Sequence, residues 1–141
     1  MNMNYYNTFI TIAPDCPAAA ATVPPDKKDG KTKAGIEFEL VANQPYVYTQ
    51  EDLLFEVHVR HKGIPPEELE AKGTQIRDEF FQKPMACMRA SMLPKKYGWG
   101  IHFNAEGKMA LVPMESAEYR EFAEGGQGVK VLAAMRSSRG K

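Results

Sequence analysis

The chain of 141 residues is the size of one domain and is long enough to bury a core without a disulfide or a metal ion. Its 18 basic and 18 acidic residues balance, so no overall field would draw it to nucleic acid or to an acidic membrane. No stretch approaches the roughly 18 apolar residues of a membrane span. The first residues do not resemble a secretory signal, and Cys16 and Cys87 are far apart. We therefore expect a single domain over residues 1–141, with free thiols, in the reducing cytoplasm.

The N-terminal part begins with a predicted strand. Residues 8–13 are β-branched and aromatic, alternate in part, and stop at Pro14. Residues 14–33 contain four prolines, an alanine run and a charged stretch, which predict a loop. A loop of this length is unusual in a compact domain, so it either moves on the surface or packs across a functional region, where it could act as a lid.

Residues 32–43 are compatible with both a helix and a strand. Ile36, Leu40 and Val41 have the spacing of one helical face, whereas alternate residues of the same segment are also apolar. The helix is favoured, and it should end before Pro45 because proline disfavours a helical predecessor.

Residues 50–61 pose the same question. Their apolar residues alternate, as in a strand, but Thr49 can cap a helix, acidic residues follow in the first turn, and Gly63 is a suitable helix end. The cap favours a helix. Its core-facing stripe would consist of Leu53, Leu54, Val57 and His61.

The clearest helix start follows at Pro65 and Pro66, which precede two acidic residues. This helix should end at Pro84, with a core-facing stripe of apolar residues and a weak point at Gly73, which costs about 1 kcal/mol relative to Ala. Further on, residues 115–122 predict a short helix and residues 129–135 favour a helix over a strand. Residues 136–141 form a basic end that we expect to be flexible.

The stretch 85–114 has the clearest strand signals. Residues 104–108 fit a three-residue hairpin loop with Gly107 in the left-handed conformation, which places His102 opposite Ala110. A longer turn at 93–97 would pair the preceding segment with the same strand.

That pairing brings Arg89 opposite His102, and alternation then sorts the sheet into two faces. The apolar face, which helices would cover, carries Met88, Ala90, Met92, Trp99, Ile101, Phe103, Met109 and Leu111. A slip of one residue would scramble this arrangement. The polar face carries Cys87, Arg89, Ser91, His102, Asn104 and Lys108.

The polar face is the candidate functional surface. Arg89 and His102 could hold a small anion or a partner segment, since His102 should titrate near neutrality. An enzyme could instead use Cys87 or His102 as nucleophile or acid–base group, but no complete set of nucleophile, base and orienting residue is evident. A solvated sheet face and a buried structural thiol are the alternatives without a function. The candidate ligand-binding residues are Arg89, Ser91, His102, Cys87, Asn104 and Lys95.

Two further patterns could carry a function. His58 and His61 could share one side of a helix, as a metal pair requires, but no third ligand has suitable spacing, so we expect no metal ion and no cofactor. A weak nucleic-acid site could use basic residues near the only tryptophan, although zero net charge disfavours it. These basic residues are Lys95, Lys96, Arg136 and Arg139.

Several motifs resemble a known family. They are residues 5–10 with 13–17, residues 43–49 with 51–52, residues 89–91 with 93–95, Tyr-Gly-Trp-Gly-Ile-His at 97–102, and residues 134–137. Together they are similar to small bacterial proteins grouped as the domain-of-unknown-function family DUF6157. The resemblance spans nearly the whole chain and implies a single domain. It implies no activity, cofactor or catalytic residue.

The sequence therefore predicts an α+β domain. Its small, mostly antiparallel sheet would consist of the N-terminal strand and a central hairpin pair, with helices packed on one face. A non-catalytic binding module for a small anionic ligand or a partner segment is the leading functional hypothesis.

Overall fold

The computed structural model describes residues 4–25, 32–83 and 87–136. Its centre is a four-stranded sheet with the order β3-β2-β1-β4. The strands are β1 (Thr8–Thr11), β2 (Trp99–Phe103), β3 (Met109–Pro113) and β4 (Lys130–Ala133). The helices are α1 (Lys33–Asn43), α2 (Gln50–Lys62), α3 (Pro66–Gln82), α4 (Met92–Lys96) and α5 (Ala117–Ala123), with short 3-10 turns η1 (Met88–Ala90) and η2 (Gly126–Gly128).

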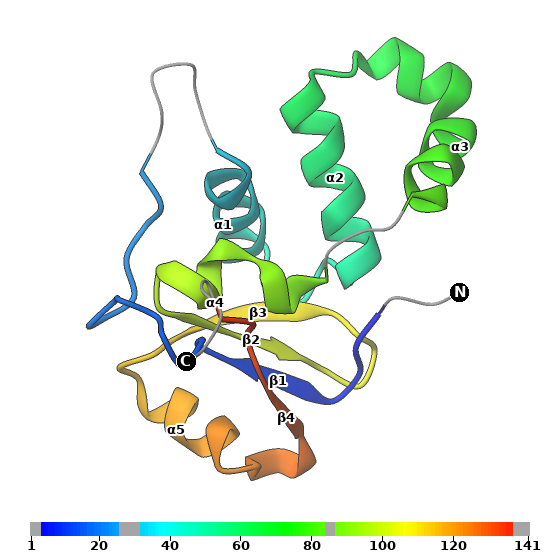
Figure 1. The fold of residues 1–141 in the computed structure, drawn as a ribbon. Coiled ribbons are helices and arrows are strands. Elements are labelled where there is room, and N and C mark those ends of the chain that lie inside the picture. Colours follow the sequence, from blue (N-terminus) through cyan, green and yellow to red (C-terminus); the bar gives the residue numbers. More distant parts are fainter. Residues whose placement is uncertain (1–3, 26–31, 84–86, 137–141) are drawn as a thin grey trace.

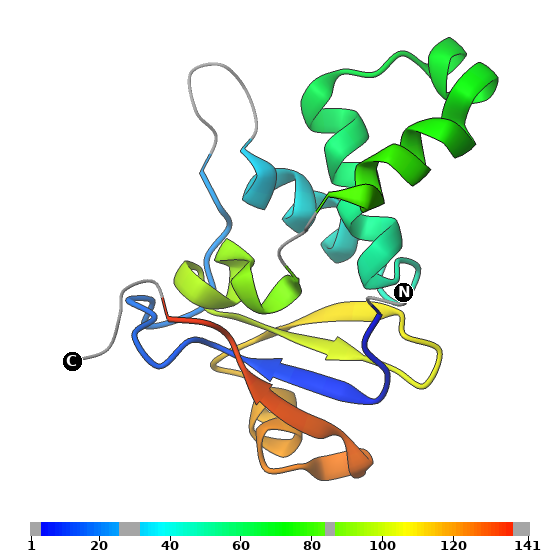
Figure 2. The same cartoon turned by 45° about the vertical axis from the view of Figure 1, so that its right-hand side comes forward.

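The helices form layers on both sides of the sheet. α1, α2 and α4 lie over one face, α5 lies under the other, and α3 stands away from the sheet beside α2 (Figures 1 and 2). The α+β class is confirmed, but the expected cover on one face only is wrong. α5 is needed on the second face because Phe9 of β1 points there, and Phe122 stacks on its ring with centroids 5.2 Å apart.

The sheet is mostly antiparallel, as expected, but it is mixed because one of its strand pairs is parallel. β1–β2 and β2–β3 are antiparallel, whereas β4 runs parallel to β1. The sequence favoured a helix for residues 129–135, and this prediction is wrong. Left-handed residues at Gly125, Gln127 and Gly128 turn the chain after α5, and the N–H of Lys130 then donates to the carbonyl of Asn7 at 2.8 Å. A helix here would leave that edge of β1 unpaired.

The hairpin prediction is confirmed. His102 pairs with Ala110, and Gly107 is left-handed with φ of 80°. The strand expected before it is wrong, because residues 88–96 form η1 and α4 instead. β1 takes the place beside β2, with Phe9 opposite His102. Strand pairing between distant segments therefore overrode the local alternation.

Two clusters of buried side chains fill the layers. Between the sheet and α1, α2 and η1 lie Ile10, Ile36, Leu40, Val41, Leu53, Val57, Met88, Ile101, Phe103 and Met109. Between the sheet and α5 lie Phe9, Val112, Phe122 and Val129. The predicted apolar face is therefore correct for residues 99–111 of the hairpin. For residues 87–92, which are not in the sheet, the predicted sorting is wrong.

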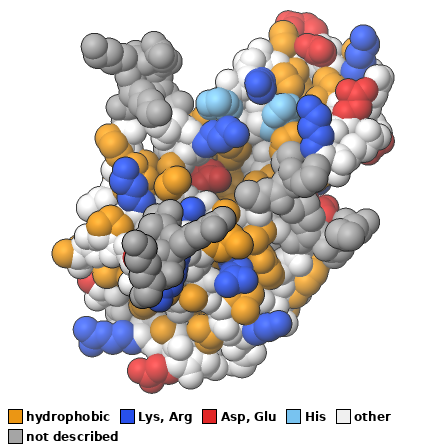
Figure 3. Space-filling view, in the orientation of Figure 1, with side chains coloured by type: hydrophobic (Ala, Val, Ile, Leu, Met, Phe, Trp, Pro, Cys, Tyr) orange, Lys and Arg blue, Asp and Glu red, His pale blue; other side chains and the backbone are white. Residues whose placement is uncertain are grey.

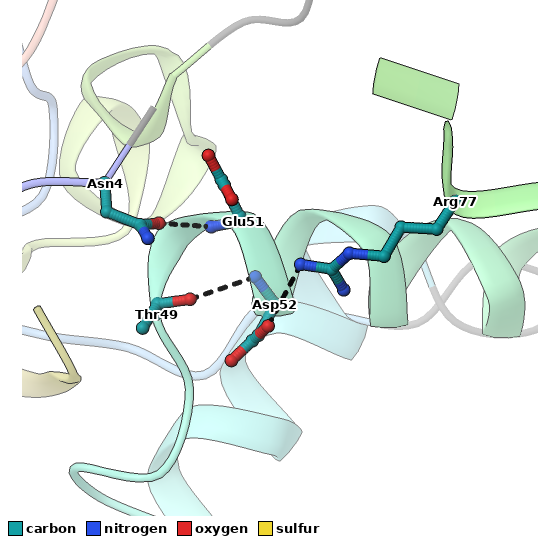
Figure 4. Close-up of polar contacts among 5 residues, drawn as sticks. All are labelled: Asn4, Thr49, Glu51, Asp52 and Arg77. Carbon is teal, nitrogen blue, oxygen red and sulfur yellow. Dashed lines mark hydrogen bonds and ion pairs between the residues drawn. The ribbon is translucent and has the colours of Figure 1, made fainter. Parts of the chain in front are cut away.

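Both ambiguous segments are helices, as favoured. Thr32 caps α1, because its Oγ1 accepts a hydrogen bond of 3.1 Å from Gly35 N–H. α2 has two caps at its first turn: Thr49 Oγ1 accepts from Asp52 N–H at 3.2 Å, and Asn4 Oδ1 accepts from Glu51 N–H at 2.9 Å (Figure 4). Asn4 thereby ties the N-terminal segment to α2, and Gly63 ends that helix in the left-handed conformation.

α3 is a helix as predicted, but its apolar stripe does not face the core. No α3 residue is buried. The helix is attached to α2 by Phe80, whose ring lies 4.5 Å from that of His58, and by Arg77, which pairs with Asp52 at 3.1 Å (Figure 4). The non-helical Lys72 kinks it beside Gly73, at the weak point that the sequence indicates.

The described part of the 14–33 loop packs against the sheet. The carbonyl oxygen of Thr22 accepts a hydrogen bond of 2.8 Å from the Trp99 indole N–H. The N–H of Thr22 donates one of 2.9 Å to the carbonyl of Tyr97. Lys33 already belongs to α1. Among the helices that the structure describes, none is both long and apolar enough to cross a bilayer.

Candidate functional site

His102 lies on the sheet face covered by α5. Its ring stacks on that of Phe122 with centroids 4.2 Å apart, and its Nδ1 is 2.8 Å from the Tyr46 hydroxyl. Burial lowers the pKa of His102 below its usual value, which favours the neutral ring. Its neighbours are aromatic side chains, not Arg89 or Cys87, beside which the sequence placed it.

Arg89 lies in η1, over the opposite face, and holds the end of β4. Its Nε donates a hydrogen bond of 2.7 Å to the carbonyl of Ala133, and its own carbonyl accepts one of 2.8 Å from Met135 N–H. The expected polar sheet face with Arg89 opposite His102 therefore does not form. The described contacts give Arg89 a structural role.

Asn104 has a local role as well. Its Oδ1 accepts hydrogen bonds of 3.0 Å from the N–H groups of Glu106 and Lys108, which closes the hairpin loop. Of the four residues proposed for nucleic acid, Lys95 and Lys96 lie at the end of α4. Arg136 is the last described residue, and Arg139 lies outside the described ranges.

Cys87 and Ser91 do come together, in a pocket of about 270 Å³ that the sequence did not predict. We call it the Glu37 pocket. It lies between α1, α2, the Phe80 end of α3 and the segment 87–92, and it is lined by Lys33, Ala34, Glu37, Leu54, Val57, His58, His61, Lys62, Phe80, Cys87, Met88, Ala90, Ser91 and Met92. In Figure 3, basic and histidine side chains gather over α1 and α2, above a region of apolar side chains.

Glu37 provides the acidic group of this pocket. The Ser91 hydroxyl donates a hydrogen bond of 2.7 Å to its Oε1. Burial raises the pKa of Glu37 to about 7, and the hydrogen bond from Ser91 and the charge of Lys33 lower it by less than burial raises it. The carboxyl is therefore divided between its neutral and ionised forms near physiological pH, unlike an ordinary surface glutamate.

Basic groups surround the same pocket. The pKa of His58 is lowered, first by burial and then by the charges of Lys62, Lys33, Lys83 and His61. Four cationic or titratable neighbours acting on one imidazole show that positive potential is concentrated here. The apolar side of the pocket is formed by residues such as Leu54, Phe80 and Met88.

The polar neighbour of the Cys87 thiol is Tyr5. The pKa of Tyr5 is raised to about 12, first by burial and then by its hydrogen bond with Cys87. His102 lies on the other side of the sheet, so the structure does not bring the proposed nucleophile and base together.

No group of three or more His, Cys, Asp or Glu side chains within residues 4–25, 32–83 and 87–136 is arranged to hold a metal ion. His58 and His61 share the Glu37 pocket with two lysines, and the His58 ring packs on Phe80. Their arrangement suits an anion better than a cation.

A larger hollow of about 950 Å³ runs along α3. Its walls are mostly exposed side chains of that one helix, such as Glu70, Lys72 and Asp78, so it is open to solvent. The Glu37 pocket is enclosed by four segments and has the perturbed carboxyl, and we regard it as the candidate site for these reasons.

Glu37 was not among the candidate residues chosen from the sequence. The signal was present once a helix was favoured: Glu37 is three residues after Ala34 and four before Val41, and both of these are buried. A glutamate on the same helical stripe as two core residues is unusual, and it points to a carboxyl that is partly buried, as Glu37 is here.

The fold and the pocket together define an α+β domain with a cation-rimmed, ligand-sized site between its helices and the segment 87–92. The chain belongs to the family of unknown function DUF6157, whose sequence profile matches residues 1–140. The resemblance seen in the motifs is thereby confirmed. No match was found among curated proteins or among solved structures.

Proposed function

We propose that this chain is a non-catalytic binding domain for a small anionic ligand, and that the Glu37 pocket is its binding site. The observation that carries the proposal is the convergence of basic side chains from two helices on one hollow with apolar walls. These side chains are Lys33 of α1 and His58, His61 and Lys62 of α2. The anionic ligand is the one expected from the sequence, whereas the site differs.

The size of the pocket supports a small molecule. Pockets for drug-sized ligands have volumes of roughly 300–1,000 Å³, and the Glu37 pocket has about 270 Å³. A metabolite somewhat smaller than a drug would fit. Its apolar part would contact Leu54, Phe80 and Met88, and its charge would lie near the lysines.

The charges supply a reason for binding. Burial lowers the pKa of His58 most, and the charges of Lys62, Lys33 and Lys83 lower it further, so like charges repel one another around this imidazole. An anion bound among them relieves this repulsion and is attracted from solution by the same field. A neutral or cationic molecule would gain no such advantage.

A thermal-shift screen of small carboxylates, phosphates and amines tests the proposal. The comparison uses the parent chain, the double variant Lys33→Ala/Lys62→Ala, and Lys130→Ala on β4 as a control that removes a lysine outside the pocket. We expect anions to raise the melting temperature of the parent and of the control, but not of the double variant. A ligand-dependent shift that the double variant retains would contradict the proposal, and so would the absence of any shift in the parent.

An acid–base enzyme is the second candidate, and Glu37 is the reason. A carboxyl with a pKa near 7 in a cleft has the property of a general base or acid. In this proposal Glu37, beside Ser91, replaces the Cys87 and His102 pair suggested by the sequence. Each anion that binds should be incubated with the protein and followed by mass spectrometry. Turnover that Glu37→Gln abolishes would favour the enzyme, and unchanged ligand would favour simple binding.

We further propose that the protein acts in the cytoplasm. Both cysteines, Cys16 and Cys87, are free, which fits a reducing compartment. Fractionation of cells producing the tagged protein tests this location. A protein recovered outside the cytoplasm, with its thiols oxidised, would contradict it.

A further inference from the structure

We infer that the ligand of the Glu37 pocket is an apolar molecule with a single carboxylate, and that Glu37 receives it as the neutral acid, so that a proton is taken up with the ligand wherever Glu37 is ionised before binding. The inference rests on the proposed function and specifies the chemistry of that site.

The geometry at Glu37 leaves one oxygen for the ligand. The Ser91 oxygen accepts a hydrogen bond of 3.1 Å from Leu93 N–H, and its single hydrogen is directed to Glu37 Oε1 at 2.7 Å. Glu37 Oε2 has no hydrogen-bond partner among the residues that the structure describes, so it can interact with a group in the pocket. A proton on Oε2 turns the carboxyl into a donor that points away from Ser91.

A carboxylate ligand near Glu37 requires this proton. Two ionised carboxylates in one enclosed site repel each other strongly, so one of them becomes protonated. The neutral Glu37 then donates to the ligand, and O–H···O⁻ hydrogen bonds of this kind are short and roughly twice as strong as neutral ones. The balance of charge is simple: the ligand brings one negative charge, Glu37 gains one proton from solution, and no covalent bond changes.

Other charged and titratable groups of the pocket also affect ligand binding and proton uptake. Those that line the pocket are Lys33, His58, His61, Lys62 and Cys87, and Lys83 acts on His58 from outside the lining. The positively charged lysines attract an anionic ligand to the pocket. The pKa of His58 is lowered first by burial and then by its cationic neighbours, and a bound anion would partly reverse the second effect. His58 is therefore a second group that could take up a proton, and the experiment must separate it from Glu37.

The hydrogen-bond donors that line the Glu37 pocket suit a carboxylate better than a phosphate. No arginine and no glycine lines the pocket among the described residues, whereas phosphate sites commonly use arginine forks or successive backbone N–H groups. The first turn of α1 cannot supply a full set, because the N–H groups of Gly35 and Ile36 already donate to Thr32 at 3.1 and 3.0 Å. The apolar walls suit a hydrocarbon or aryl body next to the single charged group.

Isothermal titration calorimetry tests the inference with four probes: phenylacetate, octanoate, phenyl phosphate and phenylacetamide. Each is titrated at pH 6 and pH 8, in two buffers with different ionisation enthalpies, which gives the number of protons taken up. We expect the two carboxylates to bind about tenfold more tightly at pH 6 than at pH 8, because Glu37 changes from mostly neutral to mostly ionised across this interval. Proton uptake should approach one per ligand at pH 8.

Two variants assign the proton. Glu37→Gln keeps a neutral donor at the same place, so carboxylates should bind it with the same affinity at both pH values and without proton uptake. His58→Asn should retain the tenfold difference. Circular dichroism verifies that both variants are folded. A pH dependence that survives in Glu37→Gln but disappears in His58→Asn would overturn the assignment to Glu37.

The probes also separate this inference from the proposed function. If no anion binds, the proposed function itself fails. If phenyl phosphate binds more tightly than both carboxylates, or if carboxylates bind at pH 8 without proton uptake, the pocket is an anion site but the inference about its ligand is wrong. Equal binding of phenylacetamide would show that the apolar body alone is recognised and would also overturn the inference.

Discussion

The Ser91 hydroxyl donates a hydrogen bond of 2.7 Å to the Glu37 carboxylate across 54 residues of sequence. Ser91 is also the N-cap of α4, because its oxygen accepts from Leu93 N–H. One side chain therefore begins a helix and fixes the acidic group of the pocket on α1. The pair links the segment 87–92, which the sequence placed in the sheet, to the helical layer above it.

Replacement of Glu37 by Gln should stabilise the protein above neutral pH. The pKa of Glu37 is raised from 4.5 to about 7 on folding, so the ionised form is disfavoured in the native state. Wild-type stability should fall as pH rises from about 4.5 to 7 and then level off, and the variant lacks this fall. At pH 8 the gain should be on the order of 3 kcal/mol, with little difference below pH 4.

Urea denaturation of both proteins between pH 4 and pH 8 measures this difference. Glu39→Gln is the matched control, because Glu39 is an exposed residue of the same helix. If the free energy of unfolding depended on pH in the same way in the wild type and in Glu37→Gln, folding would not remove the Glu37 carboxyl from solvent.

Replacement of Arg89 by Ala should weaken the end of β4 without affecting the pocket. The loss of the hydrogen bond from Nε to Ala133 should cost about 1 kcal/mol, and the amides around Ala133 should exchange faster with solvent. Lys95→Ala is the control for removal of a nearby positive charge. Hydrogen exchange measured by NMR shows the protection of the β4 amides in both variants. If Arg89→Ala abolished anion binding while β4 stayed protected, Arg89 would belong to the binding site after all.

Two glycine substitutions should act in opposite directions. A Cβ on Gly100 would lie 2.5 Å from Phe9 Cζ and 2.7 Å from a ring carbon of Tyr119, so Gly100→Ala should destabilise by roughly 1–3 kcal/mol. A Cβ on Gly73 meets nothing within 4 Å, and Gly73→Ala should strengthen α3 by up to about 1 kcal/mol. Thermal unfolding followed by circular dichroism compares the two. A neutral Gly100→Ala would mean that α5 can move away from the sheet at little cost.

Replacement of Arg77 by Ala should loosen α3 locally. Arg77 pairs with Asp52 at 3.1 Å and lies over the rings of Phe55 and Phe81 at 5.4 and 5.3 Å. Because α3 has no buried residue, its opening should cost little global stability, whereas its amides should lose protection. Anion affinity should also fall, since Phe80 of α3 forms one wall of the pocket.

Hydrogen exchange and calorimetry on Arg77→Ala give both readouts, with Lys72→Ala as a control that removes an exposed charge from the same helix. Loosening of α3 with unchanged affinity would show that its Phe80 wall contributes nothing to binding. Unchanged exchange would show that the aromatic contacts of Phe80 hold α3 without Arg77.

Sequence alone determined the features that depend on neighbouring residues. Thr49 with the acidic residues after it began α2, Gly63 ended it, and the 104–108 loop closed the hairpin in the expected register. In each case the decisive interactions, a cap or a turn with one left-handed residue, lie within a few positions along the chain. Such signals can be recognised without knowing what the segment packs against.

Only the tertiary structure decided which segments meet. β1 took the place beside β2, so the 87–92 segment became η1 and the start of α4, and residues 130–133 became a strand because the other edge of β1 was open to them. These outcomes depend on competition between distant partners, which local patterns do not contain. The same holds for the candidate site. Ser91 was chosen from the sequence, but the burial of Glu37 beside it depends on how α1, α2 and the 87–92 segment pack together.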